Sequence, residues 1–306
     1  MRILCGDIGG TNARLALWDG AALQHEQTFA SADWPGLEAP LAAWRSSTGV
    51  DPDRACFAVA GPVMDQRCVT TNLPWVVDGP TLGAQLGCPV RIINDFHAAA
   101  RGISLLGPGD AVLLFGGEPV MGAPVAVMGA GTGLGEAFVV GDQVIPGEGG
   151  HADFGPGDAR ELRLAAWLFG RNGRASWEDV LSGPGLVNLA RFASLDRGEP
   201  PPPWLDGPEA PARVAAEDPE TVDWFCALYG AEAGNLALRV LARGGVYLCG
   251  GIAPRMVPSL KAGAFRARFE NKGKLGAAIR AVPVSVVTHP GLGLLGAAAE
   301  AMRMRD

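Results

Sequence analysis

Two glycine-rich stretches, GDIGGTN at residues 6–12 and GAGTGLG at 129–135, decide how this sequence folds. Each lies between two short apolar runs, so each predicts a β-hairpin. The strands expected around them are residues 2–8, 14–18, 124–128 and 137–140. Glycine permits positive φ and lets backbone N–H groups approach a ligand, and a concave row of such amides binds anions. The repeat of strand, glycine turn and strand predicts a duplicated architecture with two anion-binding turns.

The first turn carries a carboxylate and a hydroxyl beside its glycines. Asp7 ends the first strand, where it can hold Mg²⁺ through water, because Mg²⁺ keeps several waters and takes few carboxylates. Thr11 can donate its hydroxyl to a phosphate oxygen. An ordinary hairpin turn is the alternative, and a Gly-Gly pair by itself does not exclude it.

The second turn has glycine at every other position and a hydroxyl at Thr132. It is not a Walker A loop, because no Lys-Ser/Thr pair follows it. It is not a dinucleotide fingerprint either, because a strand rather than a helix is expected next. A closely packed β-bulge is the alternative, although it leaves four alternate glycines unexplained. Two such turns favour phosphates held by two duplicated halves.

Asn94 and Asp95 follow an apolar run at 91–93 and precede an alanine-rich helix expected at 96–101. Open α/β sheets place ligands at the carboxyl ends of their strands, so this position favours a binding site. Asp95 is a candidate base for a sugar hydroxyl, and Asn94 is a candidate sugar contact. The alternative is helix N-capping, for which both residue types are favoured.

The stretch PGEGGHADF at 146–154 is a glycine-dense loop with polar side chains. Glu148 and His151 can bond to vicinal hydroxyls, while the glycines let a sugar ring approach the backbone. One histidine without a neighbouring cysteine makes a weak metal site. A solvated loop histidine is the alternative for His151. On sequence alone, Glu178 is predicted to be a carboxylate on a helix surface.

The amino-acid composition limits the classes of protein to which this chain can belong. The chain has 306 residues, 48% hydrophobic and 19% charged, and a net charge of −7. That balance predicts a folded protein of two domains and disfavours a nucleic-acid partner. No apolar run is long enough to span a membrane or form a signal peptide. The six cysteines show no zinc-ligand spacing, and Cys56 and Cys249 are expected to be buried in a reducing compartment, so we expect a cytoplasmic protein.

Further elements are expected along the rest of the chain. Helical spacing or alanine-rich composition predicts helices, and short apolar runs predict strands. The expected helices are 31–44, 161–169, 222–241 and 292–304, and the expected strands are 56–60, 111–115 and 246–249.

Six stretches taken together are similar to the bacterial glucokinases that lack zinc, within the actin, sugar-kinase and Hsp70 superfamily. They are GDIGGTNARLAL at 6–17, INDFHAAARG at 93–102, GAGTGLG at 129–135, PGEGGHADF at 146–154, LSGPGLVNL at 181–189 and GGIAPR at 250–255. They occur in order from end to end. The chain has no cysteine between 88 and 226, and so departs from the related zinc-bearing branch.

The resemblance implies an α/β, two-lobed, actin-like ATPase fold of the ribonuclease H type. A small domain is expected at 1–107 plus 292–306 and a large domain at 108–291, with the active site in the cleft between them. It implies ATP-dependent phosphorylation of D-glucose to glucose 6-phosphate, the first step of glycolysis, with ATP, Mg²⁺ and a homodimer.

The resemblance also implies residue roles. Asp95 would be the catalytic base, and glucose would be held by Asn94, Asp95, Glu148, His151 and Glu178. ATP would be held by Gly6, Asp7, Ile8, Gly9, Gly10, Thr11, Gly131, Thr132, Gly133, Gly250 and Gly251, with Asp7 also near Mg²⁺.

Three other activities stay open on sequence alone. One is a kinase for another hexose or an N-acetylhexosamine. Another is a sugar-sensing regulator with little turnover, which the intact Asp95 and both glycine turns disfavour. The third is a filament-forming, actin-like protein, which the polar residues between 148 and 178 disfavour.

Overall fold

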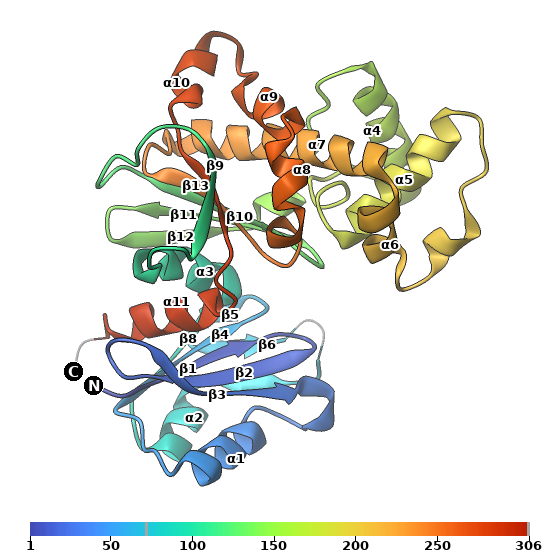
Figure 1. The fold of residues 1–306 in the computed structure, drawn as a ribbon. Coiled ribbons are helices and arrows are strands. Elements are labelled where there is room, and N and C mark those ends of the chain that lie inside the picture. Colours follow the sequence, from blue (N-terminus) through green and yellow to red (C-terminus); the bar gives the residue numbers. More distant parts are fainter. Residues whose placement is uncertain (71–72, 305–306) are drawn as a thin grey trace. The chain divides into compact units, whose positions relative to one another are not determined.

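The computed structural model describes residues 1–70 and 73–304. By contacts between its residues the chain divides into two compact units. Unit 1 consists of Met1–Asp110 with His289–Asp306, and unit 2 consists of Ala111–Thr288. Figure 1 shows the strands and helices of both. Each unit is built on a mixed sheet, so the α/β class is confirmed.

The main sheet of unit 1 has the order β3-β2-β1-β4-β8. Its strands are β1 (Ile3–Ile8), β2 (Asn12–Trp18), β3 (Leu23–Ala30), β4 (Arg54–Val59) and β8 (Val90–Asn94). The strands β1, β2 and β3 pair antiparallel, whereas β4 and β8 run parallel to β1. A small antiparallel sheet is formed by β5 (Val63–Met64), β6 (Arg67–Val69) and β7 (Val76–Asp78).

Helices cover both faces of this sheet. One face packs on α1 (Glu38–Thr48) and α2 (Gly79–Leu86), and the other on α3 (Asp95–Gly102) and α11 (Leu292–Ala301). The inner strand β4 is therefore buried along its whole length, which explains why its sequence RACFAV is apolar after Arg54. Alternate β4 residues pack into the cores on the two faces of the sheet: Phe57 faces the α1 side and Cys56 faces the α11 side.

The sheet of unit 2 has the order β12-β11-β10-β13-β14-β9. Its strands are β9 (Ala111–Phe115), β10 (Val125–Ala130), β11 (Leu134–Val140), β12 (Gln143–Gly147), β13 (Gly245–Cys249) and β14 (Val284–Val287). Again an antiparallel meander, here β10, β11 and β12, is followed by two parallel strands, β13 and β14. The predicted duplication is confirmed, and it extends to the strand order of both sheets.

The helices of unit 2 pack around α7 (Pro219–Val240), whose residues are mostly buried. The others are α4 (Ala159–Asn172), α5 (Gly183–Asp196), α6 (Ala210–Glu217), α8 (Val257–Lys261), α9 (Ala264–Glu270) and α10 (Gly276–Arg280). Single 3-10 turns join several elements, among them η3 (Gly149–His151). Aromatic side chains fill this core, for example Phe225, Tyr229 and Phe265.

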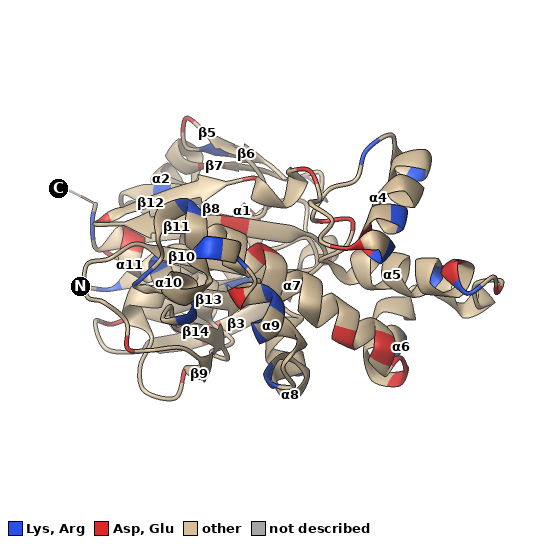
Figure 2. Ribbon diagram, turned by 90° about the horizontal axis from the view of Figure 1, so that it is seen from above, with Lys and Arg blue, Asp and Glu red and all other residues tan. Residues whose placement is uncertain are grey.

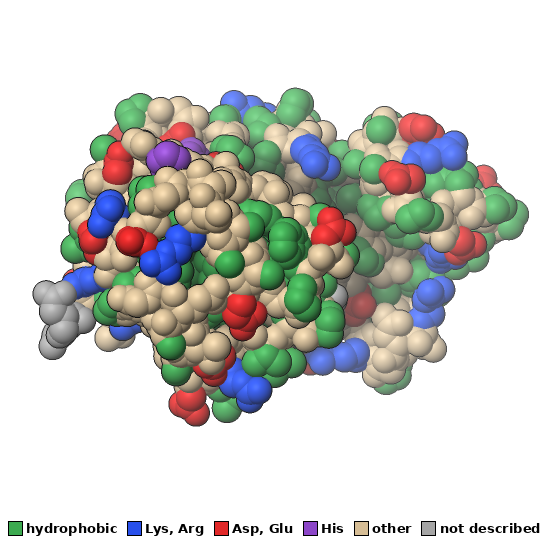
Figure 3. All heavy atoms as spheres, turned by 90° about the horizontal axis from the view of Figure 1, so that it is seen from below, with side chains coloured by type: hydrophobic (Ala, Val, Ile, Leu, Met, Phe, Trp, Pro, Cys, Tyr) green, Lys and Arg blue, Asp and Glu red, His purple; other side chains and the backbone are tan. Residues whose placement is uncertain are grey.

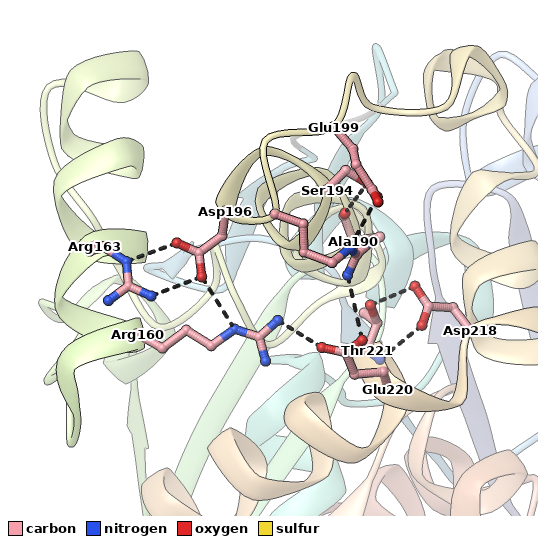
Figure 4. A network of polar contacts seen from close by, with 10 residues as sticks. Arg160, Arg163, Ala190, Ser194, Asp196, Glu199, Asp218, Glu220 and Thr221 are labelled. Carbon is pink, nitrogen blue, oxygen red and sulfur yellow. Dashed lines mark hydrogen bonds and ion pairs between the residues drawn. The ribbon is translucent and has the colours of Figure 1, made fainter.

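Charged side chains join α4, α5 and α7 at the surface (Figure 4). Asp196 at the end of α5 accepts two hydrogen bonds of 2.8 Å from Arg163 of α4, and these hold the pKa of Asp196 below its usual range. Arg160 of α4 reaches Glu220 at the start of α7, with 2.9 Å between Nη2 and Oε1. Because the network is exposed, it orients the three helices more than it stabilises them.

The surface mixes charges of both signs. Figure 2 shows Lys and Arg interspersed with Asp and Glu along the ribbon, and Figure 3 shows apolar side chains distributed among polar ones on one face. Within residues 1–70 and 73–304, no helix combines the length and apolar character needed to cross a membrane.

Several predicted boundaries need correction. The helix expected at 31–44 is a 3-10 turn at Ser31–Asp33 followed by α1, which begins only at Glu38. The reason is that Trp34 is extended at the residue before Pro35, as the residue preceding proline prefers to be. The C-terminal helix ends at Ala301 instead of 304. The other expected strands and helices occur where they were predicted, within a few residues, whereas several elements, among them β3, β14 and α5, were not predicted.

Candidate active site

The first glycine turn joins β1 and β2, as predicted. The N–H of Gly9 donates to the carbonyl of Asn12, and the carbonyl of Gly9 accepts from the hydroxyl of Ser31. Thr11 is exposed at the tip. Within the described part of the chain, the amides of Gly10 and Thr11 donate no hydrogen bond, so they can receive an anion.

The conformational reason proposed for these glycines is wrong. Gly9, Gly131 and Gly133 do not have φ in the left-handed region. Close approach explains Gly133 instead, because a Cβ there would lie 2.5 Å from Oε2 of Glu178. Gly250, after β13, does have a positive φ, at +80°.

Asp7 is paired with an arginine that sequence reasoning did not single out. It lies directly opposite Arg14 in the β1–β2 register, and its Oδ2 accepts from Nη2 of Arg14. Arg14 also donates to the carbonyl of Pro290, 2.7 Å away. The Asp7 side chain keeps 21% of its surface exposed. With one oxygen engaged by a guanidinium, the carboxylate fits a water-mediated Mg²⁺ contact better than direct ligation.

The second glycine turn, Gly131–Thr132–Gly133, joins β10 and β11. The N–H of Gly131 donates to Gly133, and its carbonyl accepts from the N–H of Gly183 at the start of α5. Thr132 is exposed. Gly250 packs against the backbone of Ala130, where a Cβ would lie 2.6 Å from the carbonyl oxygen. The turn is thus held by α5 and by the end of β13, the segment predicted to lie near adenosine.

The structure separates the roles of Asn94 and Asp95. Asn94 is the N-cap of α3, and its Oδ1 accepts from the N–H groups of Phe96 and His97. Its Nδ2 donates to the carbonyl of Gly61, 3.1 Å away. Asp95 is the first residue of α3 and is half-buried at the carboxyl end of β8. Asn94 is therefore the cap, and Oδ1 of Asp95 also accepts from the N–H of Phe96, 2.9 Å away.

The loop 148–151 and the segment around Glu178 lie against each other. The N–H of Glu178 donates to Gly150, and the N–H of Trp177 donates to Ala152. This pairing brings Oε1 of Glu178 to 3.9 Å from Nδ1 of His151. Glu148 and His151 are exposed, and Glu178 is one-third exposed. The structure therefore brings two of the predicted sugar residues within reach of one ligand, with Glu148 on the same short loop.

The prediction that Glu178 lies on a helix surface is wrong. It lies in the turn between α4 and α5, and its Oε2 accepts from the N–H of Leu134, 2.8 Å away. Leu134 directly follows the second glycine turn. Glu178 thus links the predicted phosphate turn to the predicted sugar loop, which its sequence neighbours do not indicate.

The likeness to known proteins agrees with this geometry. The family model for glucokinase matches residues 4–304. The chain belongs to the glucokinase family. A glucokinase from Yersinia enterocolitica is 41% identical over 308 residues, covering 97% of this chain and 95% of the relative.

Solved structures agree with the fold of this glucokinase-family chain. A glucokinase from an Antarctic psychrotroph superposes with a TM-score of 0.90 at 33% identity, and covers 99% of both chains. A ROK family glucokinase from Streptomyces griseus, solved with glucose and AMPPNP, has a TM-score of 0.68 at 21% identity and covers 99% of this chain and all of its own. At that identity the second likeness supports the fold alone. The two-lobed, actin-like fold class is confirmed.

No group of three or more His, Cys, Asp or Glu side chains in the described ranges, 1–70 and 73–304, is arranged to hold a metal ion. Within residues 1–70 and 73–304 no disulfide is present, and Cys56 and Cys249 are buried as predicted.

A buried carboxylate anchors the helix that carries Asp95. Glu300 of α11 is 8% exposed and accepts from Arg91 of β8 at 2.7 Å and from Arg101 of α3 at 3.0 Å. Nε2 of His97 in α3 lies 3.3 Å from Oε2, the same oxygen that accepts from Arg101. These contacts, the one with His97 first, lower the pKa of Glu300 to about 2. Sequence reasoning missed this group because Arg91 and Glu300 are 209 positions apart.

Glu300→Gln is expected to lower the free energy of unfolding by about 3 kcal/mol at pH 7, because it removes one partner of a buried ion pair. The folded pKa of Glu300 lies below its ordinary 4.5, so this contribution is present above pH 4.5 and is lost as the pH falls toward 2. Urea unfolding at pH 7 and pH 3 measures both effects. Glu217→Gln, in an exposed pair with Arg213, is the control and should cost less than about 1 kcal/mol. Equal losses of unfolding free energy for the two variants would contradict the proposed role of Glu300 in holding α3.

Proposed function

We propose that this chain transfers the γ-phosphoryl group of ATP to the 6-hydroxyl of D-glucose, with Asp95 as the base that accepts the hydroxyl proton. The match to the glucokinase family over residues 4–304 carries the proposal. The position of the half-buried Asp95 carboxylate at the carboxyl end of β8 supports the residue assignment. Glucose 6-phosphate would enter glycolysis, and we expect the enzyme to act in the cytoplasm as a homodimer.

The proposed binding of ATP uses both glycine turns. The amides of Gly10 and Thr11, and the exposed hydroxyls of Thr11 and Thr132, would donate to phosphate oxygens. Gly250 and Gly251 would lie beside the adenosine. Mg²⁺, when bound, would neutralise charge on the phosphate oxygens. Asp7 would orient its water shell, with Arg14 keeping the carboxylate in place.

The proposed binding of glucose uses Asn94 with Glu148, His151 and Glu178. Carboxylates and an imidazole can bond to vicinal hydroxyls and so orient the ring with its 6-hydroxyl toward Asp95. Phosphoryl transfer depends chiefly on such positioning and on charge stabilisation. Asp95 then takes the proton as the oxygen bonds to phosphorus, which prevents a positive charge from building on that oxygen.

The direct test is release of ADP by the purified chain, measured by a coupled assay with MgATP and D-glucose. Turnover that depends on glucose supports the proposal. Sugar affinity measured by calorimetry without ADP release would instead indicate a sugar-binding regulator. ADP release only with another hexose or an N-acetylhexosamine would reassign the acceptor. Light scattering tests the homodimer separately.

Glu178→Ala is expected to raise the KM for both glucose and ATP by about tenfold each. A hydrogen bond to a charged group contributes about 1.5–3 kcal/mol, and this carboxylate is proposed to bond both to the sugar and to the Leu134 amide. Glu178→Gln keeps an acceptor for that amide, so its effect should fall mainly on glucose. Steady-state kinetics with each substrate varied measures the two constants.

Asp179→Asn is the matched control, because Asp179 holds the same turn through Ser176 without touching the loop or the glycine turn. Both KM values should stay near those of the unmodified chain. If Glu178→Ala leaves the KM for ATP unchanged, the proposed link between the two sites is wrong.

A further inference from the structure

Glu136 is a buried acid in an otherwise apolar strand. It lies on β11, is 2% exposed and stands opposite Gly147 in the β11–β12 register. Its Oε2 packs directly on Gly149, where an added Cβ would lie only 1.7 Å away. Gly149 lies between Glu148 and His151 in the sequence. The carboxyl group of Glu136 therefore packs directly beneath the loop that is proposed to bind the sugar.

The surroundings of this carboxyl group are charged but incompletely paired. Glu232 of α7 is fully buried beside it, and one guanidinium, Arg239, serves both: its Nη1 lies 2.9 Å from Glu232 and 3.4 Å from Glu136. Within the residues that the structure describes, Oε1 of Glu136 is buried without a hydrogen-bond partner.

Most of the other polar groups on the neighbouring elements interact with Glu232 and not with Glu136. Asn235 of α7 donates to Glu232 at 2.8 Å and accepts from Lys272 at 2.7 Å. The Tyr229 hydroxyl accepts from the N–H of Ala130. Glu148 and His151 flank Gly149 on the loop side. Two carboxyl groups thus share one guanidinium in direct contact, whereas the ammonium group of Lys272 is linked to Glu232 only through Asn235.

Burial, and then the negative charge of Glu232, raise the pKa of Glu136 to about 7, against the opposing effect of Arg239. Burial also raises the pKa of Glu232. Glu136 therefore changes its charge near neutral pH, in a position where the backbone of Gly149 leaves it no room to move freely.

We propose that Glu136 is a positioning residue for the sugar loop, and that its protonation state controls how Glu148 and His151 are held. The proposal rests on the assignment of this loop to glucose. Protonated Glu136 packs under Gly149 next to a single charged glutamate. Ionised Glu136 is repelled by Glu232, and because its contact with Gly149 is tight, any displacement of the carboxylate moves the loop.

The first test is the KM for glucose of the full chain between pH 6 and pH 9. For the unmodified chain we expect a rise of about fivefold through pH 7, at the lower end of typical coupling between sites, with little change in kcat. Glu136→Gln imitates the protonated state and should keep the low KM throughout. Every other pH-dependent step is common to both proteins, so it does not produce the difference between them.

Glu232→Gln is the second variant. It removes the repelling charge and keeps an acceptor for Asn235, so the rise in KM should again disappear. Glu161→Gln removes a buried carboxylate paired with Arg268 elsewhere in unit 2, and should keep the profile of the unmodified chain. Identical pH profiles for Glu136→Gln and the unmodified chain, or a raised KM for Glu136→Gln at every pH, would overturn the proposal.

Thermal unfolding gives a readout that needs no turnover. The folded pKa of Glu136 lies above its ordinary 4.5, so its favourable contribution is present below pH 4.5 and is lost as the pH rises through 7. The Tm of Glu136→Gln minus that of the unmodified chain should therefore grow by about 5 °C between pH 4.5 and 7.5 and then level off. A constant difference would overturn the proposal. Absence of turnover with every sugar would overturn the proposed function and leave this measurement intact.

Discussion

Asp95→Ala is expected to reduce the turnover number with glucose by about 10²–10⁴-fold, the usual contribution of a general base. The variant should bind ATP nearly as well as the unmodified chain, because Asp95 belongs to neither glycine turn. Coupled detection of ADP at saturating glucose gives the turnover number, and calorimetry with a non-hydrolysable ATP analogue gives the affinity.

Asp78→Ala is a matched control in the same unit. Asp78 is also an acid at the start of a helix, and it caps α2 by accepting from the N–H of Thr81. Its loss should cost about 1 kcal/mol of stability and leave turnover unchanged. Near-normal turnover of Asp95→Ala would show that Asp95 has only a structural role at the start of α3.

Sugars that lack a hydroxyl bound by Glu148, His151 or Glu178 are expected to be used roughly 10⁴-fold less efficiently than glucose, measured as kcat/KM. A site built to bond a hydroxyl rejects an analogue without it strongly, because its own polar groups are then left unpaired. The measurement is ADP release across a panel of deoxyglucoses, mannose, fructose and N-acetylhexosamines under saturating MgATP.

The position of Glu178 indicates which sugar analogues should be rejected most strongly. Its Oε2 already bonds to the Leu134 amide, so Oε1, on the side of His151, is the oxygen left for a sugar. An analogue that leaves Oε1 unpaired should be penalised more than one that alters a solvent-facing hydroxyl. Comparable efficiency with glucose, mannose and fructose would contradict the assignment of these three residues to the sugar.

Local sequence signals predicted the parts of the molecule that depend on neighbours in the chain. The alternation of apolar residues around 6–12 and 129–135 predicted both hairpins, and the repeat between them predicted the duplicated strand order. Helix capping at Asn94–Asp95 was also anticipated, although which residue caps was left open. The structure decides it, because Asn94 is extended and can turn its side chain back to two amides.

Other predictions failed because their cause lies outside the local sequence. The positive φ that glycine permits was one reason given for the two turns, but Gly133 is required instead by the approach of Glu178, 45 residues later. Glu178 was expected on a helix surface, and the pairing of 150–152 with 177–178 draws it inward. One local signal for Glu136 did exist, namely an acid in the strand sequence LGEAFVV.

By itself, then, the sequence determined the α/β class and the two glycine turns, because strand alternation and turn chemistry act over a few residues. Only the tertiary structure decided what holds those parts in place. The contacts of Arg14 with Asp7, of Glu300 with α3 and of Glu136 with Gly149 form when separate elements pack. Burial then turns such contacts into strong electrostatic effects, which no stretch of sequence specifies alone.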